Sequence, residues 1–225
     1  MIKVNKKIDS FPHLDLDVLL NSYMNGIFPM AESKIDESVF WVKPKLRGIL
    51  PLDSFHTSKS LKRHIQKNRS IIKFNENFDL ILNGCSNRKD TWINSTLSNT
   101  YKLLFKAGHA QSIEVFESNK LVGGLFGINI NGAFFGESMF STATDASKVA
   151  LCHLVARLRK GGYVLLDTQF VTDHLTSLGA VEITRDAYHL QLEQALLIDA
   201  KFYCGALDAG DAGDLAFRQS LTQTS

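Results

Sequence analysis

Apolar residues recur at helical spacing in several stretches of the chain and at every second position in one central block. Leu16, Leu19, Leu20 and Tyr23 fall on one stripe of a predicted helix that Gly26 terminates. The same period predicts further helices, and alternation or short apolar runs predict strands. We expect helices over 14–25, 57–68, 95–107 and from Thr144 to Lys160, and strands over 111–117, 120–130, 132–140 and 163–170.

The three central strands form a predicted antiparallel meander. Asn131-Gly132 is a favoured hairpin turn pair and separates the second strand from the third. A helix, the strand over 163–170, and another helix and strand between Asp173 and Leu197 follow. This order predicts an α+β fold.

Composition is that of an ordinary globular protein, with 225 residues, 44% hydrophobic residues, 21% charged residues and a net charge of +2. Its three cysteines lack the spacing of a zinc site. No apolar run has the length of a membrane span and no signal peptide is evident, so we expect no membrane partner and a cytoplasmic location. The expected organisation is a small N-terminal domain (1–54), a larger domain (55–203) and a mobile tail (204–225).

Candidate chemistry begins at the end of the run "YVLLDTQF", where Asp167 and Gln169 would share one face of a strand. A carboxylate beside an amide can polarise it, and the amide oxygen can then hold an incoming amine. From spacing alone, a role in capping the loop or satisfying the backbone is the commoner alternative. In "GESMFS", Glu137 lies between apolar strand positions, where burial requires a partner and suggests a cation site, or else marks a solvated strand end.

Two further patterns are candidates for binding. The apolar residues Leu125, Met139, Leu151, Leu154, Leu158 and Leu166 could wall one pocket between sheet and helix, or simply form core. Lys59, Lys62, Arg63 and Lys67 cluster on the predicted helix over 57–68, as in a phosphate-binding patch or a solvated face. Trp92 lies in a polar stretch and could stack on a base or anchor the core.

These stretches together resemble the leucyl/phenylalanyl-tRNA–protein transferase family. The resemblance covers roughly residues 20 to 190, in family order, through "GIFPM", "WVKPKLRGILPL", "FHTSKSLKR", "TWI", "GHAQSIEV", "LVGGLFG", "GESMFS", "ASKVAL" and "LLDTQF…LGAVEI". It implies a C-terminal domain similar to GNAT acetyltransferases behind a small N-terminal domain. It also implies transfer of Leu or Phe from Leu-tRNA or Phe-tRNA to proteins that begin with Arg or Lys, which marks them for degradation.

The resemblance also implies roles for the candidate residues. Gln169 would accept a proton or hydrogen bond from the acceptor amine, Asp167 would orient and polarise Gln169, and Glu137 would hold the basic acceptor. The six apolar residues would bind the transferred side chain, Trp92 would lie near the terminal adenosine, and the basic helix would contact tRNA phosphates. The ester is already activated, so the family needs no cofactor, metal or covalent intermediate, only positioning and a weak base.

One departure concerns Met30, which stands where many members have a Trp that stacks on the adenine. A thioether contact would replace that stacking. Two rival functions remain. A coenzyme A–dependent acetyltransferase would need a pyrophosphate loop of the form [Q/R]-x-x-G-x-[G/A], which the chain lacks, and a noncatalytic RNA-binding module would have no need of Asp167 and Gln169.

Overall fold

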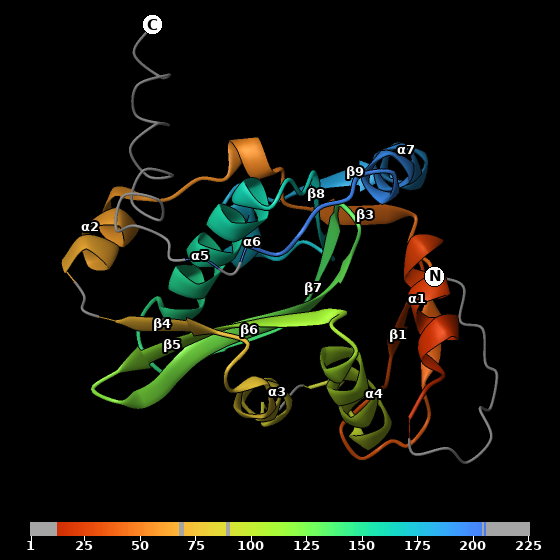
Figure 1. Cartoon of the computed structure of the whole chain (residues 1–225), viewed down its shortest axis with the longest axis horizontal. Helices are drawn as coiled ribbons and strands as arrows, with labels where there is room; N and C mark the ends of the chain where they lie inside the picture. The colour runs from red at the N-terminus through yellow and green to blue at the C-terminus, as the bar shows by residue number, and fades with distance from the viewer. Residues whose placement is uncertain (1–12, 68–69, 89–90, 204, 206–225) are drawn as a thin grey trace, which may run out of the picture.

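The computed structural model describes residues 13–67, 70–88, 91–203 and 205 (Figure 1). The helices are α1 (Leu16–Met24), α2 (Lys59–Lys67), α3 (Phe78–Ser86), α4 (Ser95–Lys106), α5 (Ala146–Lys160), α6 (Asp173–Thr176) and α7 (Arg185–Leu196), with a 3-10 turn at Leu52–Ser54. The strands are β1 (Phe28–Met30), β2 (Phe40–Val42), β3 (Leu46–Ile49), β4 (Ile71–Phe74), β5 (Ala110–Glu117), β6 (Lys120–Ile130), β7 (Ala133–Ser141), β8 (Leu165–Gln169) and β9 (Val181–Thr184).

Within this described part of the chain, the strands form a mixed seven-stranded sheet, ordered β4-β5-β6-β7-β8-β3-β9, and a separate pair, β1-β2. Neighbours in the large sheet are antiparallel except β7 and β8, which run parallel. Helix α5 connects β7 to β8, as a parallel pair requires. The α+β class expected from the sequence is confirmed at this level.

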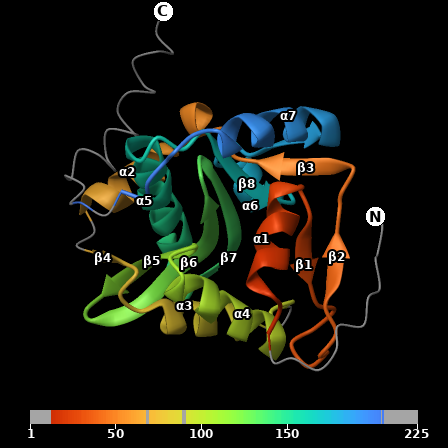
Figure 2. The ribbon, with the colours of Figure 1, turned by 45° about the vertical axis from the view of Figure 1, so that its right-hand side comes forward.

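Helices cover both faces of the large sheet (Figures 1 and 2). Helix α5 packs on one face, together with α2, while α3 and α4 pack on the other, next to α1. Consecutive residues of β6 serve the two layers, since Leu125 belongs to the core under α5 and Phe126 to the core under α3 and α4. The site described below lies between these two cores.

Strands β7 and β8 stay paired over a short distance and then part. Their register runs from Ala133 opposite Leu165 to Phe135 opposite Asp167. Beyond that point β7 continues to Ser141 along β6, while Gln169 at the end of β8 lies opposite Gly48 of β3. The separation leaves an opening in the sheet that side chains from both strands can line.

The expected meander is confirmed by β5, β6 and β7, and the expected helices by α1, α2, α4 and α5. Ser58 is the residue that caps α2, because its Oγ accepts a hydrogen bond from the backbone N–H of Leu61 at 3.1 Å. Strand β4 and helix α3 had no counterpart among the expected elements.

The pattern of apolar and polar positions predicts no regular element over 41–52, where two prolines favour irregular linker or edge structure, and the structure corrects this. This stretch contains β3, which lies inside the large sheet with β8 on one side and β9 on the other. The boundary expected at residue 54 stays a prediction, although β3 precedes it and joins the sheet of the larger domain. The expected tail falls almost entirely outside the described residues. Among the residues that the structure describes, no helix is both long and apolar enough to cross a membrane.

Candidate active site

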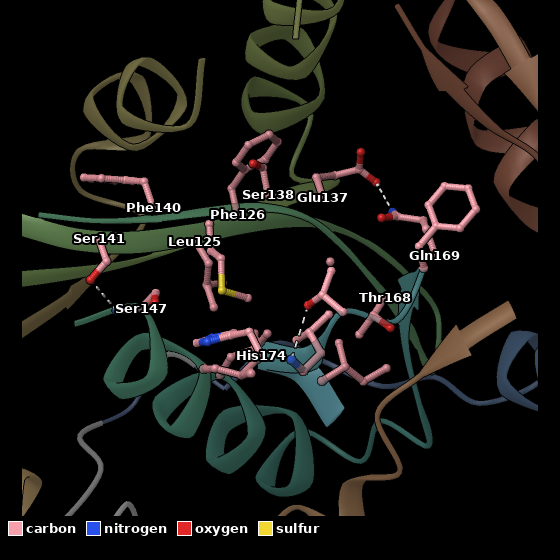
Figure 3. Close-up of a pocket in the computed structure, with 18 of the residues that line it drawn as sticks. Leu125, Phe126, Glu137, Ser138, Phe140, Ser141, Ser147, Thr168, Gln169 and His174 are labelled. Atoms are coloured by element: carbon pink, nitrogen blue, oxygen red, sulfur yellow. Dashed lines mark hydrogen bonds between the residues drawn. The ribbon is translucent and has the colours of Figure 1, made fainter. Parts of the chain in front are cut away.

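A pocket of about 460 Å³ occupies the opening between β7 and β8 (Figure 3), a volume typical of small-ligand sites. Its apolar wall includes five of the six residues expected to form one: Leu125, Met139, Leu151, Leu154 and Leu166. Leu158 is buried in the same core but is absent from the lining. The pocket therefore has a wall built jointly by β6, β7, α5 and β8.

Glu137, on β7, is the buried carboxylate of this pocket, with 6% of its surface exposed. The hydroxyls of Tyr23 and Tyr101 each donate a hydrogen bond to it at 2.8 Å, and Nε2 of Gln169 donates a third at 3.0 Å. Burial raises the pKa of Glu137 to about 7, although the two tyrosine hydrogen bonds oppose the rise. Near neutral pH the group is therefore divided between its charged and protonated forms.

Gln169 ends β8 and reaches across the opening to Glu137. Its side chain lines the pocket, and the hydrogen bond from Nε2 to Glu137 fixes the orientation of the amide. The amide oxygen then points away from Glu137 and remains an acceptor (Figure 3). A group that can accept a hydrogen bond is thus held beside a carboxylate at the edge of an apolar pocket.

Asp167 lies next to this pair but outside the pocket lining, and it is fully buried. Its carboxylate accepts hydrogen bonds from Arg47, from the Tyr188 hydroxyl at 2.6 Å and from the backbone N–H of Gln169 at 2.8 Å. The expected contact between Asp167 and Gln169 therefore runs through the backbone of Gln169. The side-chain amide is oriented by Glu137.

Comparison with known proteins now identifies the family. Residues 49–193 match the family model of leucyl/phenylalanyl-tRNA protein transferase, and residues 13–45 match the model of that family's N-terminal domain. The chain belongs to this family of aminoacyltransferases. A leucyl/phenylalanyl-tRNA–protein transferase of Ruegeria sp. (strain TM1040) is 49% identical over 212 residues, which are 94% of this chain and 99% of the relative. One of Cereibacter sphaeroides (strain ATCC 17025 / ATH 2.4.3) is 52% identical over 191 residues, 85% of this chain and 89% of the relative.

Among solved structures, the crystal structure of FemX aligns with a TM-score of 0.49 and 12% sequence identity, over 75% of this chain and 66% of that chain. The assignment to the transferase family follows from the sequence relatives and the family models.

The residues expected to contact tRNA lie in different places. Trp92 is half-buried, lines the pocket and packs edge-on against Tyr101, with ring centroids 6.4 Å apart. Met30, on β1, packs against the core and is absent from the pocket lining. On α2, Lys59, Arg63 and Lys67 are exposed and Lys62 is half-buried. The structure thus brings Trp92 to the pocket, whereas α2 packs against α5 and presents its cations on a separate surface.

Four residues of this site were not among the functional residues expected from the sequence: Tyr23, Tyr101, Arg47 and Tyr188. Tyr23 lies on the apolar stripe of its predicted helix, and a buried tyrosine hydroxyl requires a partner, so its pairing with Glu137 was a signal within reach. Tyr101 donates to Glu137 in the same way, from the helix predicted over 95–107. Arg47 lies outside every element predicted from the sequence, and Tyr188 lies in the region from Asp173 to Leu197, where a helix is predicted without bounds. Their partner Asp167 is 120 and 21 residues away in sequence, respectively, and no local pattern indicates such a contact.

Proposed function

We propose that this chain transfers Leu or Phe from Leu-tRNA or Phe-tRNA to the N-terminal amine of proteins that begin with Arg or Lys, which marks those proteins for degradation. The observation that supports the proposal most directly is the Glu137–Gln169 pair at the edge of the apolar pocket. An apolar wall suits the transferred side chain, and the polar pair suits an amine. Because the chain belongs to the transferase family, we assign both features to one reaction, the transfer of an apolar amino acid to an amine.

The wall of leucine and methionine side chains would hold the transferred amino acid. Such a wall offers dispersion contacts and excludes water, but it discriminates between apolar side chains only modestly. A methylene group more or less in an apolar pocket changes selectivity by about 10- to 200-fold. Acceptance of both Leu and Phe is consistent with this limit, and Met139 adds an adaptable thioether to the wall.

In the proposed reaction, the nitrogen of the acceptor amine attacks the carbonyl carbon of the aminoacyl ester. The new C–N bond replaces the C–O bond to the ribose, and the ribose hydroxyl leaves with a proton. The free amide oxygen of Gln169 would accept a hydrogen bond from the attacking amine and aim its lone pair at the ester. Because a neutral amide is a weak base, most of the rate enhancement would come from positioning.

Glu137 would supply the charge that selects the acceptor. A carboxylate buried with two tyrosine donors attracts a cation strongly, since the surrounding dielectric is low. An N-terminal residue with a basic side chain brings such a cation beside the reacting amine. Its arrival would also favour the ionised form of Glu137 over the protonated form.

Recognition of the RNA would divide between the pocket and α2. Trp92 provides an aromatic face at the pocket for the terminal adenosine, and the exposed cations of α2 provide a phosphate-binding surface. The role of Met30 would be confined to packing against the core on which Trp92 also packs.

The finer organisation is also a proposal. Residues 1–54 would form a small N-terminal domain that contributes β3 to the sheet of a GNAT-like domain over 55–203. The parting of the parallel strands β7 and β8 supports the GNAT-like assignment, because it creates a substrate opening within the sheet. The proposed location is the cytoplasm, where aminoacyl-tRNA is made.

The function is tested by a transfer assay with four acceptor peptides that differ in their first residue. Labelled Leu-tRNA and Phe-tRNA are offered to peptides that begin with Arg, Lys, Asp or Ala. We expect label on the Arg and Lys peptides alone. Label on the Asp peptide would contradict the role given to Glu137, and an acetyl mass shift with acetyl-CoA but no transfer from tRNA would favour the acetyltransferase alternative.

A further inference from the structure

The backbone of Gln169 adopts a conformation that few residues other than glycine adopt. Its φ is +59°, and the N–H of Phe170 donates to the carbonyl of Thr168 at 2.6 Å, which closes a three-residue turn centred on Gln169. Such turns with a positive φ are rare and strained. They persist where the surrounding structure holds them, so the elements that hold this turn determine where the Gln169 amide points.

Two features hold the turn. The first is the hydrogen bond from the N–H of Gln169 to Oδ1 of Asp167 at 2.8 Å. The second is Gly48 of β3, which lies opposite Gln169 in the sheet. A Cβ atom at Gly48 would lie 2.8 Å from the backbone carbonyl carbon of Phe170 and 2.8 Å from Oγ1 of Thr168. The turn therefore needs both a fixed Asp167 carboxylate as acceptor and a residue without a side chain at position 48 of β3.

Asp167 is itself fixed by two buried side chains from distant elements. Nε of Arg47 lies 2.9 Å from Oδ1, Nη2 lies 2.6 Å from Oδ2, and the Tyr188 hydroxyl donates to Oδ2 at 2.6 Å. Arg47 and Asp167 are 2% and 0% exposed. Together with the Gln169 N–H, these donors occupy the acceptor positions of the carboxylate, about four in number. The acceptor positions of Asp167 are thus taken up by donors from the protein itself.

Arg47 is in turn held by its surroundings. Its guanidinium lies over the rings of Phe28 and Tyr188, 4.4 and 4.7 Å from their centroids, and Nη1 donates to the carbonyl of Gly26 at 3.0 Å. Burial lowers the pKa of Arg47, but the charge and hydrogen bonds of Asp167, together with Tyr188 and Tyr23, raise it, and the net pKa lies above its usual value. The bidentate contact needs the planar fork of an arginine, which a lysine lacks.

We propose that Arg47 and Tyr188 are positioning residues for the transfer reaction. They immobilise Asp167, Asp167 fixes the turn at Gln169 through its backbone N–H, and the turn delivers the Gln169 amide to Glu137 and the pocket. Asp167 then acts as the anchor of Gln169 and takes no part in moving the proton. This inference rests on the proposed function for its effect on transfer, but its structural step can be measured without any transfer.

The first test is a double-mutant cycle. Tyr188→Phe removes one hydrogen bond to Asp167 and keeps the ring over which Arg47 lies. The loss of this hydrogen bond to the charged Asp167 should loosen the Gln169 amide and thereby lower kcat/KM roughly tenfold. In a Gln169→Ala background, the same change should lower kcat/KM less than twofold, because no amide remains to be positioned. An equal factor in both backgrounds, with matching losses of thermal stability, would show a purely structural role and overturn the proposal.

The second test reads the turn directly, by amide hydrogen exchange at Gln169. In Tyr188→Phe and in Arg47→Lys we expect the Gln169 N–H to exchange at least tenfold faster than in the parent, relative to amides of α5. Tyr163→Phe, which alters a buried tyrosine in the other core, should leave this rate unchanged. If the Gln169 N–H exchanges as slowly in Tyr188→Phe and Arg47→Lys as in the parent, the proposal is wrong. If the two variants show the faster exchange but the parent protein transfers no amino acid, the positioning of Gln169 by Arg47 and Tyr188 stands and the proposed function fails.

Discussion

Replacing Glu137 by Gln should weaken the enzyme as a catalyst and stabilise it as a folded protein. The folded pKa of Glu137 is about 7, against an ordinary value of 4.5. A difference of this size corresponds to about 3 kcal/mol of unfolding free energy. The cost arises because the carboxylate is withdrawn from water, and the hydrogen bonds from Tyr23 and Tyr101 offset only part of it.

The sign of the effect follows from proton binding. Below about pH 4.5 the carboxyl is protonated in both states, so parent and Glu137→Gln should differ little from this source. As the pH rises towards 7, the unfolded chain releases its proton while the folded chain retains it, and the stability of the parent falls. Above pH 7 the full difference is present, and the variant should gain up to about 3 kcal/mol relative to the parent.

The assay is urea denaturation of both proteins between pH 4 and pH 8, compared as the difference at each pH. Groups that titrate in both proteins cancel in this difference. Glu182→Gln, at an exposed position on β9, is the matched control and should show no trend. In the same preparations, Glu137→Gln should lower kcat/KM for an Arg peptide by at least tenfold. A stability difference that does not change with pH would refute the account of this buried charge.

Three further variants test the remaining parts of the site. Leu154→Ala enlarges the pocket and should raise the ratio of kcat/KM for Phe-tRNA over Leu-tRNA severalfold, measured in competition. An unchanged ratio would show that Leu154 does not contact the transferred side chain. Trp92→Ala should weaken phenylalanyl-adenosine binding by about 1–3 kcal/mol if the ring stacks on the base, and equal affinities would exclude such stacking. Replacing Lys59, Arg63 and Lys67 together by Gln should raise KM for charged tRNA and reduce its salt dependence. The same triple variant should leave kcat/KM for phenylalanyl-adenosine unchanged, and a parallel loss would contradict a phosphate-binding role.

The grouping of the apolar pocket residues could be predicted because they lie on regular elements, whereas their role as a pocket wall rather than plain core was implied only by the family resemblance. Leu125 and Met139 lie opposite each other on paired strands, and Leu151 and Leu154 share a helical face, so periodicity brings them together. Leu158, one turn further along α5, fits the same periodicity but lies in the core beyond the pocket. Sequence period determines the buried face of a helix, whereas the position at which a cavity ends depends on where β7 and β8 part.

The polar part of the site was predicted less completely for a different reason. Proximity in sequence suggested that Asp167 acts on the Gln169 side chain, and the two residues are indeed neighbours in space. The positive φ of Gln169, however, redirects its amide to Glu137, and Arg47 occupies the Asp167 carboxylate. These contacts join residues more than 30 positions apart. They depend on tertiary arrangement, for which one sequence contains no local signal.

The most direct measurement of the central claim is a crystal structure with both substrates represented. The ligands would be a stable amide analogue of 3′-phenylalanyl-adenosine and a peptide that begins with Arg. We predict the phenyl ring against Leu125, Leu151 and Leu154, the peptide amine hydrogen-bonded to the amide oxygen of Gln169, and its nitrogen about 3–3.5 Å from the acyl carbon. A phenyl ring bound outside this pocket, or a peptide amine out of reach of Gln169, would contradict the account.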